Sequence, residues 1–408
     1  SDGQVFYTQP TSGNHFIQVV LPEHVFSKGK LPGVSGTNGM LPREPTYPAM
    51  HWEQQAYVQI DQVGSYTAAA GCAIYEGGAW PAKWNYGYFT TEPTLNIVSH
   101  FMVEPDGVTY KAKREPGREQ TEFIRSQNLW FRPIENRVGP DGALYIVDFC
   151  NQAVIHNDTR GPTHGPANAA VRPDRDHYYG RIWKVQHKEA KKVEVVKMEK
   201  NDLDGLVRVA EANPNARLKQ QAWRLIRENH DIEKVASKVR GRTSANFPTV
   251  PQAVYGGSIP QTKFEQAVNE TRKDPAFWVA HYSGISDTML QSALIAAFST
   301  DSMRIIDACL TADRNNHNAP IRAEGLPSLV SALLPAALSP QESANLIKLM
   351  TTCADAPSSA DELKPIILQA LAQQTGISLT ATPALKEPLQ KLLANPATSA
   401  LALPLVAK

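Results

Sequence analysis

Six residues whose side chains could bind a metal ion or a substrate lie close together near the middle of the chain. They are Asp148, Asn151, His156, Arg175, Asp176 and His177. Aspartate and asparagine oxygens suit Ca²⁺, whereas histidine nitrogens combined with aspartate oxygens suit a transition metal. A structural role is the alternative: Asp148 would cap the turn at the end of a strand, and the other side chains would hydrogen-bond to neighbouring loops. The residue types leave both roles open.

Two further histidines lie in segments rich in turn residues. His164 lies in "RGPTHGPAN", and Gly/Pro loops of this kind often contact substrates. His15 lies in "SGNHFIQV", and it could point to the same face as the central cluster. A single loop histidine is, however, more often solvated than functional.

An aromatic group could bind a sugar. It comprises Trp80, Trp84, Tyr86, Tyr88 and Trp130. Strands also bury aromatic side chains in their cores, and core packing is the expected role for most of them. The helical half contains no GxSxG, HExxH or P-loop motif, and therefore no recognisable catalytic constellation.

Length and composition exclude several classes of protein. The 408 residues suffice for two or three domains, and the formal net charge of +1 gives no reason to expect a nucleic-acid or membrane partner. No apolar run is long enough for a transmembrane helix. The four cysteines include no CxxC or CxxCH, which excludes a covalent c-type haem or a zinc ribbon in this chain. They are expected to be free thiols.

The elements that position these residues change type along the chain. Residues 1–187 contain Asp-Gly turns and short runs of strand-forming residues such as Leu144–Val147 and Arg181–Val185. This pattern is typical of an all-β sandwich, barrel or propeller. Residues 188–201 are rich in Lys and Glu, and they predict a linker.

Residues 202–408 have the apolar spacing of amphipathic helices. Leu203–Ala210 and Leu218–Ile226 form two such runs, broken at Asn213-Pro214. Further helices are predicted at 263–272, 288–298, 302–311, 326–338, 340–352, 360–374 and 384–393. Short helices joined by Pro/Asn/Asp loops indicate an α-solenoid of HEAT type, with an irregular bundle as the alternative. The apolar tail "TSALALPLVAK" lets the solenoid continue beyond Lys408.

The sharpest local signal is "FRPIENRVGPDGALYIVDF", in which a GPDG turn leads into a strand that ends at Asp148. Weaker copies of the turn start at Asp106 and Asp2. The segments "DFCNQAVIHN" and "RPDRDHYYGRIWKV" resemble the last propeller blade of large dehydrogenase-like proteins of Planctomycetes and Verrucomicrobia, in which HEAT repeats follow the propeller. "CAIYEGGAWPAKWNYGYF" resembles the preceding blade of soluble sugar dehydrogenases that use pyrroloquinoline quinone (PQQ). The likeness is clear over residues 2–229. Beyond them the chain resembles these proteins only in that it is predicted to be helical.

This resemblance implies a partial, six-bladed β-propeller over 1–187 and a HEAT-like solenoid over 202–408. The chain would start inside a middle blade, so another polypeptide would complete the ring, most simply the N-terminal fragment of the same precursor. The implied function is a sugar or alcohol dehydrogenase outside the cytoplasm, either periplasmic, extracellular or membrane-associated, with a cytochrome c partner. The alternatives are a non-catalytic subunit that holds partners in an assembly, and a lactonase or lyase with a metal in the propeller channel.

The residues at the positions that bind PQQ in the relatives include one that favours this cofactor and two that count against it. Arg132 falls at an arginine that binds the anionic quinone in the relatives, although it could instead tie blade loops together. Thr94 stands near the position of a quinone-binding lysine, and Glu92 beside it adds negative charge, which counts against PQQ. The catalytic histidine of the relatives lies in an earlier blade, so none is expected here.

Overall fold

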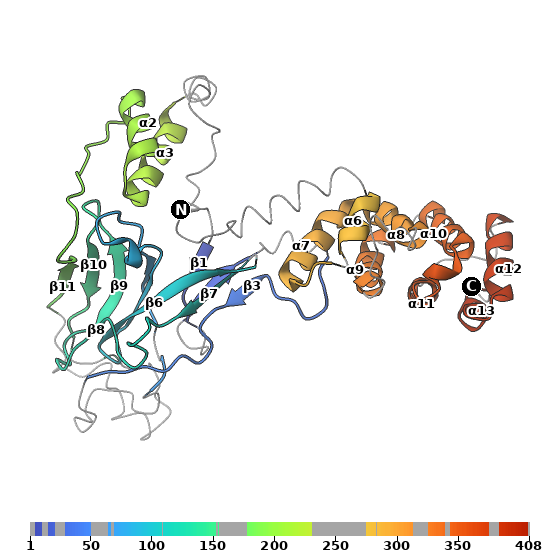
Figure 1. The fold of residues 1–408 in the computed structure, drawn as a ribbon, viewed down its shortest axis with the longest axis horizontal. Coiled ribbons are helices and arrows are strands. Elements are labelled where there is room, and N and C mark those ends of the chain that lie inside the picture. Colours follow the sequence, from blue (N-terminus) through green and yellow to red (C-terminus); the bar gives the residue numbers. More distant parts are fainter. Residues whose placement is uncertain are drawn as a thin grey trace. The chain divides into compact units, whose positions relative to one another are not determined.

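The computed structural model describes residues 5–9, 15–20, 29–49, 64–66, 69–107, 109–151, 154, 178–230, 275–282, 284–312, 325–338, 343–374 and 383–406. The chain forms two compact units. One consists of Ser1–Val19 with Asn38–Gly257, and the other of Val20–Thr37 with Ser258–Lys408. The predicted order, strands first and helices after them, is confirmed (Figure 1).

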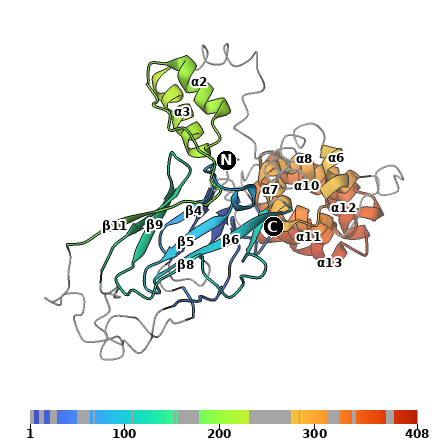
Figure 2. The ribbon, with the colours of Figure 1, turned by 60° about the vertical axis from the view of Figure 1, so that its left-hand side comes forward.

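The first unit is built from small β-sheets. One sheet has the order β1 (Val5–Tyr7), β2 (Ile17–Val19), β3 (Thr37–Gly39). The largest consists of β4 (Cys72–Ile74), β5 (Tyr88–Glu92), β6 (Ile97–Asp106) and β7 (Thr109–Lys113), and β8 (Ile124–Arg125) also pairs with β6. The third has the order β11 (Arg181–Val185), β10 (Leu144–Asp148), β9 (Pro133–Val138). Figure 2 shows β9, β4, β5 and β6, in that order, as neighbouring strands of a curled surface.

The predicted Asp-Gly turns form β-hairpins. Asp106-Gly107 joins β6 to β7, and Asp141-Gly142 joins β9 to β10. Gly142 has a φ of 74°, and a Cβ at this position would lie 2.5 Å from the Cβ of Ala79. Only glycine satisfies both the left-handed backbone and the close approach. The turn sequence therefore fixes the hairpin and its close contact with Ala79.

Adjacent sheets meet at another close backbone approach. The N–H of Gly71 donates to the carbonyl of Ile134 over 2.9 Å, and a Cβ on Gly71 would lie 2.3 Å from the Cα of Glu135. Asn136 also donates from Nδ2 to the Gly71 carbonyl over 3.0 Å. These contacts hold β9 beside β4 and β5.

Aromatic side chains fill the cores of the sheets. Tyr75 stacks on Trp80 with ring centroids 4.3 Å apart, and Phe16 stacks on Tyr88 at 3.6 Å. Trp80, Trp84 and Tyr88 are all buried, which confirms that core packing is their role. The four cysteines are free thiols, as expected.

Two helices follow the strands within the same unit. They are α2 (Leu203–Ala212), capped by Asp202, and α3 (Ala216–Asn229), capped by Asn215. Residues 186–201, which precede them, contain no helix or strand, in agreement with a linker. The compact unit nevertheless extends to Gly257 and not to the predicted linker, because the start of α3 docks on the strands. Asn215 donates from Nδ2 to the Gly139 carbonyl over 2.8 Å, and the N–H of Ala216 donates to Glu76 over 3.0 Å.

Asn215 therefore has two separable roles, and its substitution tests them. Asn215→Asp keeps an oxygen for the α3 cap but places a carboxylate against the Gly139 carbonyl, so the helix pair is expected to lose its docking. Asn215→Ala removes both roles and is expected to lower the free energy of unfolding by about 2–3 kcal/mol. Hydrogen exchange measured by mass spectrometry should show faster exchange in α2 and α3 for both variants. Unchanged exchange in Asn215→Asp would contradict the docking role.

The second unit consists of helices and of Val20–Thr37, in which Leu31 packs against the helical core. The helices are α6 (Pro275–Tyr282), α7 (Thr288–Phe298), α8 (Ser302–Thr311), α9 (Leu326–Leu338), α10 (Ser343–Asp355), α11 (Lys364–Gln373), α12 (Lys386–Ala394) and α13 (Ser399–Val406). Each contacts the helix two places further along, so that α6, α8, α10 and α12 form one row and α7, α9, α11 and α13 another. Leucine, isoleucine and valine side chains fill the space between the rows.

The predicted helix bounds agree with the structure where the apolar period is regular. The predictions 288–298, 302–311 and 326–338 match α7, α8 and α9 residue for residue. The predicted helix at 263–272 lies outside the described residues. Two helices were missed, α6 and α13. Each has an almost uniformly apolar sequence, and such a sequence gives no amphipathic period to detect.

Candidate functional site

Asp148 is the centre of the predicted site, and its carboxylate is fully buried at the end of β10. Oδ1 accepts hydrogen bonds from the backbone N–H groups of Arg132 and Cys150, both at 2.8 Å. Oδ2 accepts from Nε of Arg181 and Nε1 of Trp183, also at 2.8 Å. Four donors use the acceptor capacity of the two oxygens. The carboxylate thus ties together the start of β9, the turn after β10 and strand β11.

Arg132 is also fully buried. Its Nε donates to the carbonyl of Asn151 over 3.1 Å, and Nη1 donates to the carbonyls of Pro93 and Thr94 over 3.0 and 3.1 Å. The guanidinium thereby joins the β5–β6 turn to the segment after β10. This is the alternative that the sequence left open, an arginine that ties blade loops together.

The structure brings three of the predicted site residues together, namely Arg132, Asp148 and Asn151. His156, His164, Arg175, Asp176 and His177 lie outside the described residues. Within the described part, the cluster is a buried hydrogen-bonded hub and not an open binding site.

The residues at this hub do not fit the cofactors that the resemblance implies. A quinone carboxylate needs exposed basic donors, but Arg132 is committed to backbone carbonyls, Thr94 replaces the lysine, and Glu92 is buried beside them. Ca²⁺ needs six to eight oxygen ligands. Asp148 offers none that is free of a hydrogen-bond donor.

His15 lies apart from this hub, in the core beside β2. Its ring stacks on Tyr66 with centroids 3.7 Å apart, and Nε2 has no hydrogen-bond partner. Burial, assisted by the positive charge of Arg114, lowers its pKa to about 3. The histidine is therefore neutral and enclosed, and it does not project from a loop.

A second buried polar network was not predicted from the sequence. Arg114 donates to both carboxylate oxygens of Glu122 over 3.1 and 3.2 Å and to Glu44 over 2.7 Å. Glu122 also accepts from Ser99 over 2.6 Å, and Ser99 accepts from Tyr66 over 2.5 Å. Burial alone would lower the pKa of Arg114, but the hydrogen bonds and charge of Glu122 raise it above its ordinary value. The sequence "KREPGREQTE", which contains Arg114 and Glu122, did not predict a buried network, because a charged segment of this type is usually solvated.

His100 is a third enclosed polar group. Its ring lies 4.7 Å from that of Phe89 and 4.8 Å from that of Trp84, and its Nε2 has no hydrogen-bond partner. Burial, followed by the charges of Arg118 and Lys83, lowers its pKa to about 4. The side chain is buried among aromatic rings, so it is a core residue.

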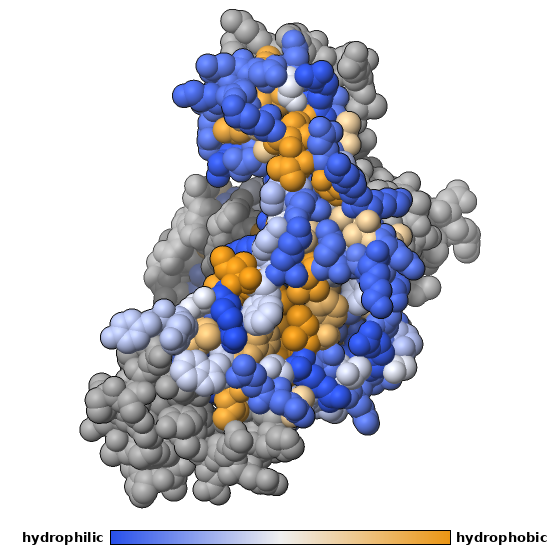
Figure 3. Space-filling model, turned by 90° about the vertical axis from the view of Figure 1, so that its left-hand side faces the viewer, coloured by the Kyte–Doolittle hydropathy of each residue, from blue (hydrophilic) through white to orange (hydrophobic). Residues whose placement is uncertain are grey.

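Exposed apolar side chains gather at β11 in the first unit. Ile182 is 71% exposed and Trp183 is 44% exposed, and just before the strand Tyr178 and Tyr179 are 90% and 63% exposed. Figure 3 shows apolar residues in a strip on the face of the molecule that carries β11 and the helix pair. We call the exposed side chains of Tyr178, Tyr179, Ile182 and Trp183 the β11 surface, which includes both sides of the edge strand because the successive residues Ile182 and Trp183 point to opposite faces of the sheet.

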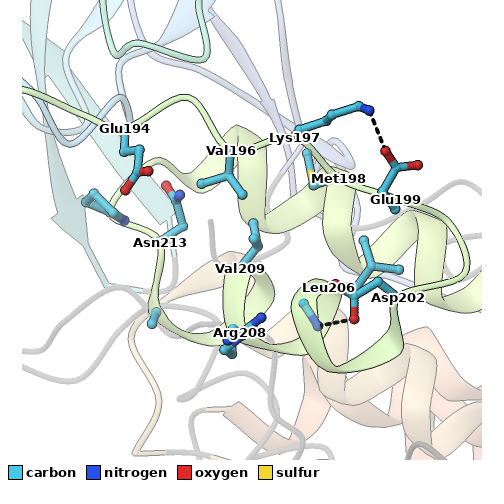
Figure 4. Close-up of a pocket in the computed structure, with 13 residues that line it drawn as sticks. Glu194, Val196, Lys197, Met198, Glu199, Asp202, Leu206, Arg208, Val209 and Asn213 are labelled. Carbon is cyan, nitrogen blue, oxygen red and sulfur yellow. Dashed lines mark hydrogen bonds and ion pairs between the residues drawn. The ribbon is translucent and has the colours of Figure 1, made fainter.

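Two pockets belong to the first unit. One, of about 540 Å³, lies between α2 and residues 194–199, with Val196, Met198 and Val209 in its wall (Figure 4). Its charged groups are of both signs, and Lys197 pairs with Glu199 over 2.7 Å. The second, of about 300 Å³, lies between β8 and β11 beside the β11 surface.

Neither a metal centre nor a membrane span is found in the part of the chain that the structure describes. No group of three or more His, Cys, Asp or Glu side chains is placed to hold a metal ion there. No helix within the described ranges combines the length and the apolar character needed to cross a bilayer.

Comparison with known proteins gives one match. No curated protein and no solved structure matches the chain. Residues 1–189, which cover the strands and end within the linker, match the family described as a domain of unknown function (DUF7133).

Proposed function

We propose that this chain is a non-catalytic binding subunit that holds another polypeptide on the β11 surface. The observation that carries the proposal is the exposure of four large apolar side chains at β11, which pairs with β10 on one side and has no second strand among the described residues. Exposed strand edges and apolar patches mark protein-interaction sites. An extended segment of the partner would add to β11 as a further strand.

The chemistry of the hub supports a binding function over a catalytic one. The polar groups of Asp148 and Arg132 are occupied by internal hydrogen bonds, and these bonds hold β11 in place. A strand edge that is fixed before binding loses less conformational entropy on association. The oxidoreductase function implied by the resemblance has no such support, and it stays a prediction.

The finer architecture is part of the same proposal. The two Asp-Gly hairpins and the close contact of β4 and β5 with β9 support adjoining blades of a β-propeller. The two alternating rows of helices support a HEAT-like solenoid. Together they describe a scaffold with one face for a partner polypeptide.

Photo-cross-linking in the native host tests the proposal. Benzoylphenylalanine at position 182 is expected to cross-link another polypeptide, which mass spectrometry can identify. Position 5, on the exposed edge strand β1, is the matched control and is expected to give no such product. With the purified partner, Ile182→Lys should weaken binding about tenfold or more, whereas Val5→Lys should leave it unchanged.

Three results would overturn the proposal. They are equal cross-linking at both positions, a cross-link only between two copies of this chain, and reduction of a redox dye by sugars or alcohols when PQQ and Ca²⁺ are added. The first would remove the special role of β11, and the second would make the chain its own partner. The third would make the chain an enzyme.

A further inference from the structure

The pocket beside the β11 surface has an apolar interior. Ile124 and Phe131 line it from the β8 side, and Ile146, Trp183 and Val185 line it from the sheet. Its volume of about 300 Å³ is at the lower end of the range for small-molecule sites, which is roughly 300–1,000 Å³. A space of this size suits one or two large apolar side chains better than a cofactor.

The charged groups around this pocket are all basic. Arg125, Arg181 and Lys184 line it, and no acidic residue does so within the described residues. Arg181 pairs with Asp148 over 2.8 Å, and Lys184 pairs with Asp141 over 2.6 Å. Arg125 is exposed at the end of β8 and makes no ion pair with any described residue. Its guanidinium is therefore free to bind a carboxylate.

The sequence around the pocket extends this positive charge. Residues 181–201 contain seven basic and three acidic residues, whereas the whole chain has a net charge of only +1. This segment forms β11 and the linker that follows it. The segment that contains β11 thus has a surplus of positive charge, which would attract an acidic partner.

We propose that the partner segment is an acidic strand that carries a large apolar side chain. The inference rests on the proposed function and specifies its partner. The segment pairs with the edge of β11, and a side chain opposite Trp183 lies on the same face of the sheet and enters the pocket. A carboxylate two residues away in the segment, on the same face of the strand, binds Arg125. Apolar contact provides affinity, and the charge selects the partner.

Selection from a random peptide library displayed on phage tests this inference on the purified chain. The selected peptides are expected to combine Asp or Glu with a large apolar residue. Ile182→Lys should weaken a synthetic peptide of the selected sequence by about tenfold. Arg125→Glu should weaken it by about fivefold, and selection on that variant should no longer favour acidic peptides. Lys111→Glu on the exposed edge strand β7 and Val5→Lys are the matched controls, and neither should change binding.

The outcomes separate this inference from the proposed function. Peptides that require Ile182 but are not acidic, or that bind Arg125→Glu equally well, would overturn the inference and leave β11 as a binding surface. Failure to obtain any peptide that depends on Ile182 would also overturn it, because a peptide strand would then not be the occupant. The cross-link at position 182 would still decide independently whether another polypeptide binds there.

Discussion

Asp148→Asn is expected to lower the free energy of unfolding of the first unit by about 3–5 kcal/mol. The carboxylate accepts four hydrogen bonds in a buried site, two of them from the side chains of Arg181 and Trp183. An amide presents an NH₂ group to at least one of these donors, and it removes the charge that balances Arg181. Urea unfolding followed by tryptophan fluorescence measures the loss.

Asp106→Asn is the matched control, because Asp106 also ends a strand before a turn but is exposed. Its effect is expected to stay within about 0.5 kcal/mol. The same experiment distinguishes the hub from a metal site. If Ca²⁺ raised the stability of the wild type and this gain disappeared in Asp148→Asn, the carboxylate would be a metal ligand and the structural role would be contradicted.

The first unit is expected to lose stability steeply as the pH falls from about 6.5 to 5, because His15 and His100 are enclosed without a hydrogen-bond partner for Nε2. Their pKa values are lowered from 6.5 to about 3 and about 4. Below pH 6.5 the unfolded chain binds protons that the folded chain excludes. Well below pH 6.5 each histidine therefore removes about 1.4 kcal/mol per pH unit, and about half of that at pH 6.5 itself. Together they lower the free energy of unfolding by about 3 kcal/mol over this interval.

The double variant His15→Gln, His100→Gln tests this dependence, because glutamine is polar but does not titrate. Its absolute stability can differ from that of the wild type, so the measured quantity is the slope of the free energy of unfolding against pH. The variant should have a mean slope smaller by about 2 kcal/mol per pH unit between pH 6.5 and 5. Equal slopes in the two proteins would show that the rings protonate in the folded state.

The elements were predictable where one local pattern dominates. The Asp-Gly turns predicted the hairpins β6–β7 and β9–β10, and the amphipathic period predicted α7, α8 and α9 to the residue. The linker at 188–201 was also predicted, but the compact unit continues to Gly257. One contact that joins α3 to the strands is the hydrogen bond from Asn215 to the turn at Gly139. The two residues are far apart in sequence, so no local sequence pattern predicts this contact.

The candidate site was predictable in composition but not in function. Arg132 hydrogen-bonds to both Asp148 and Asn151, a contact that was not predicted, and the donors and acceptors of these residues are used within the protein. The β11 surface was not predicted, because "RIWKV" has the composition of a core strand. Its exposure depends on which strand lies at the edge of the sheet.

The sequence by itself determined the change from strands to helices and the position of the tight turns. These features follow from backbone preferences and from apolar periods within a few residues. Only the tertiary structure decided whether a polar side chain is occupied or available, as with Arg132 and Arg125. Availability depends on burial and on partners distant in sequence, since a buried polar group must be satisfied internally whereas an exposed one can bind another molecule.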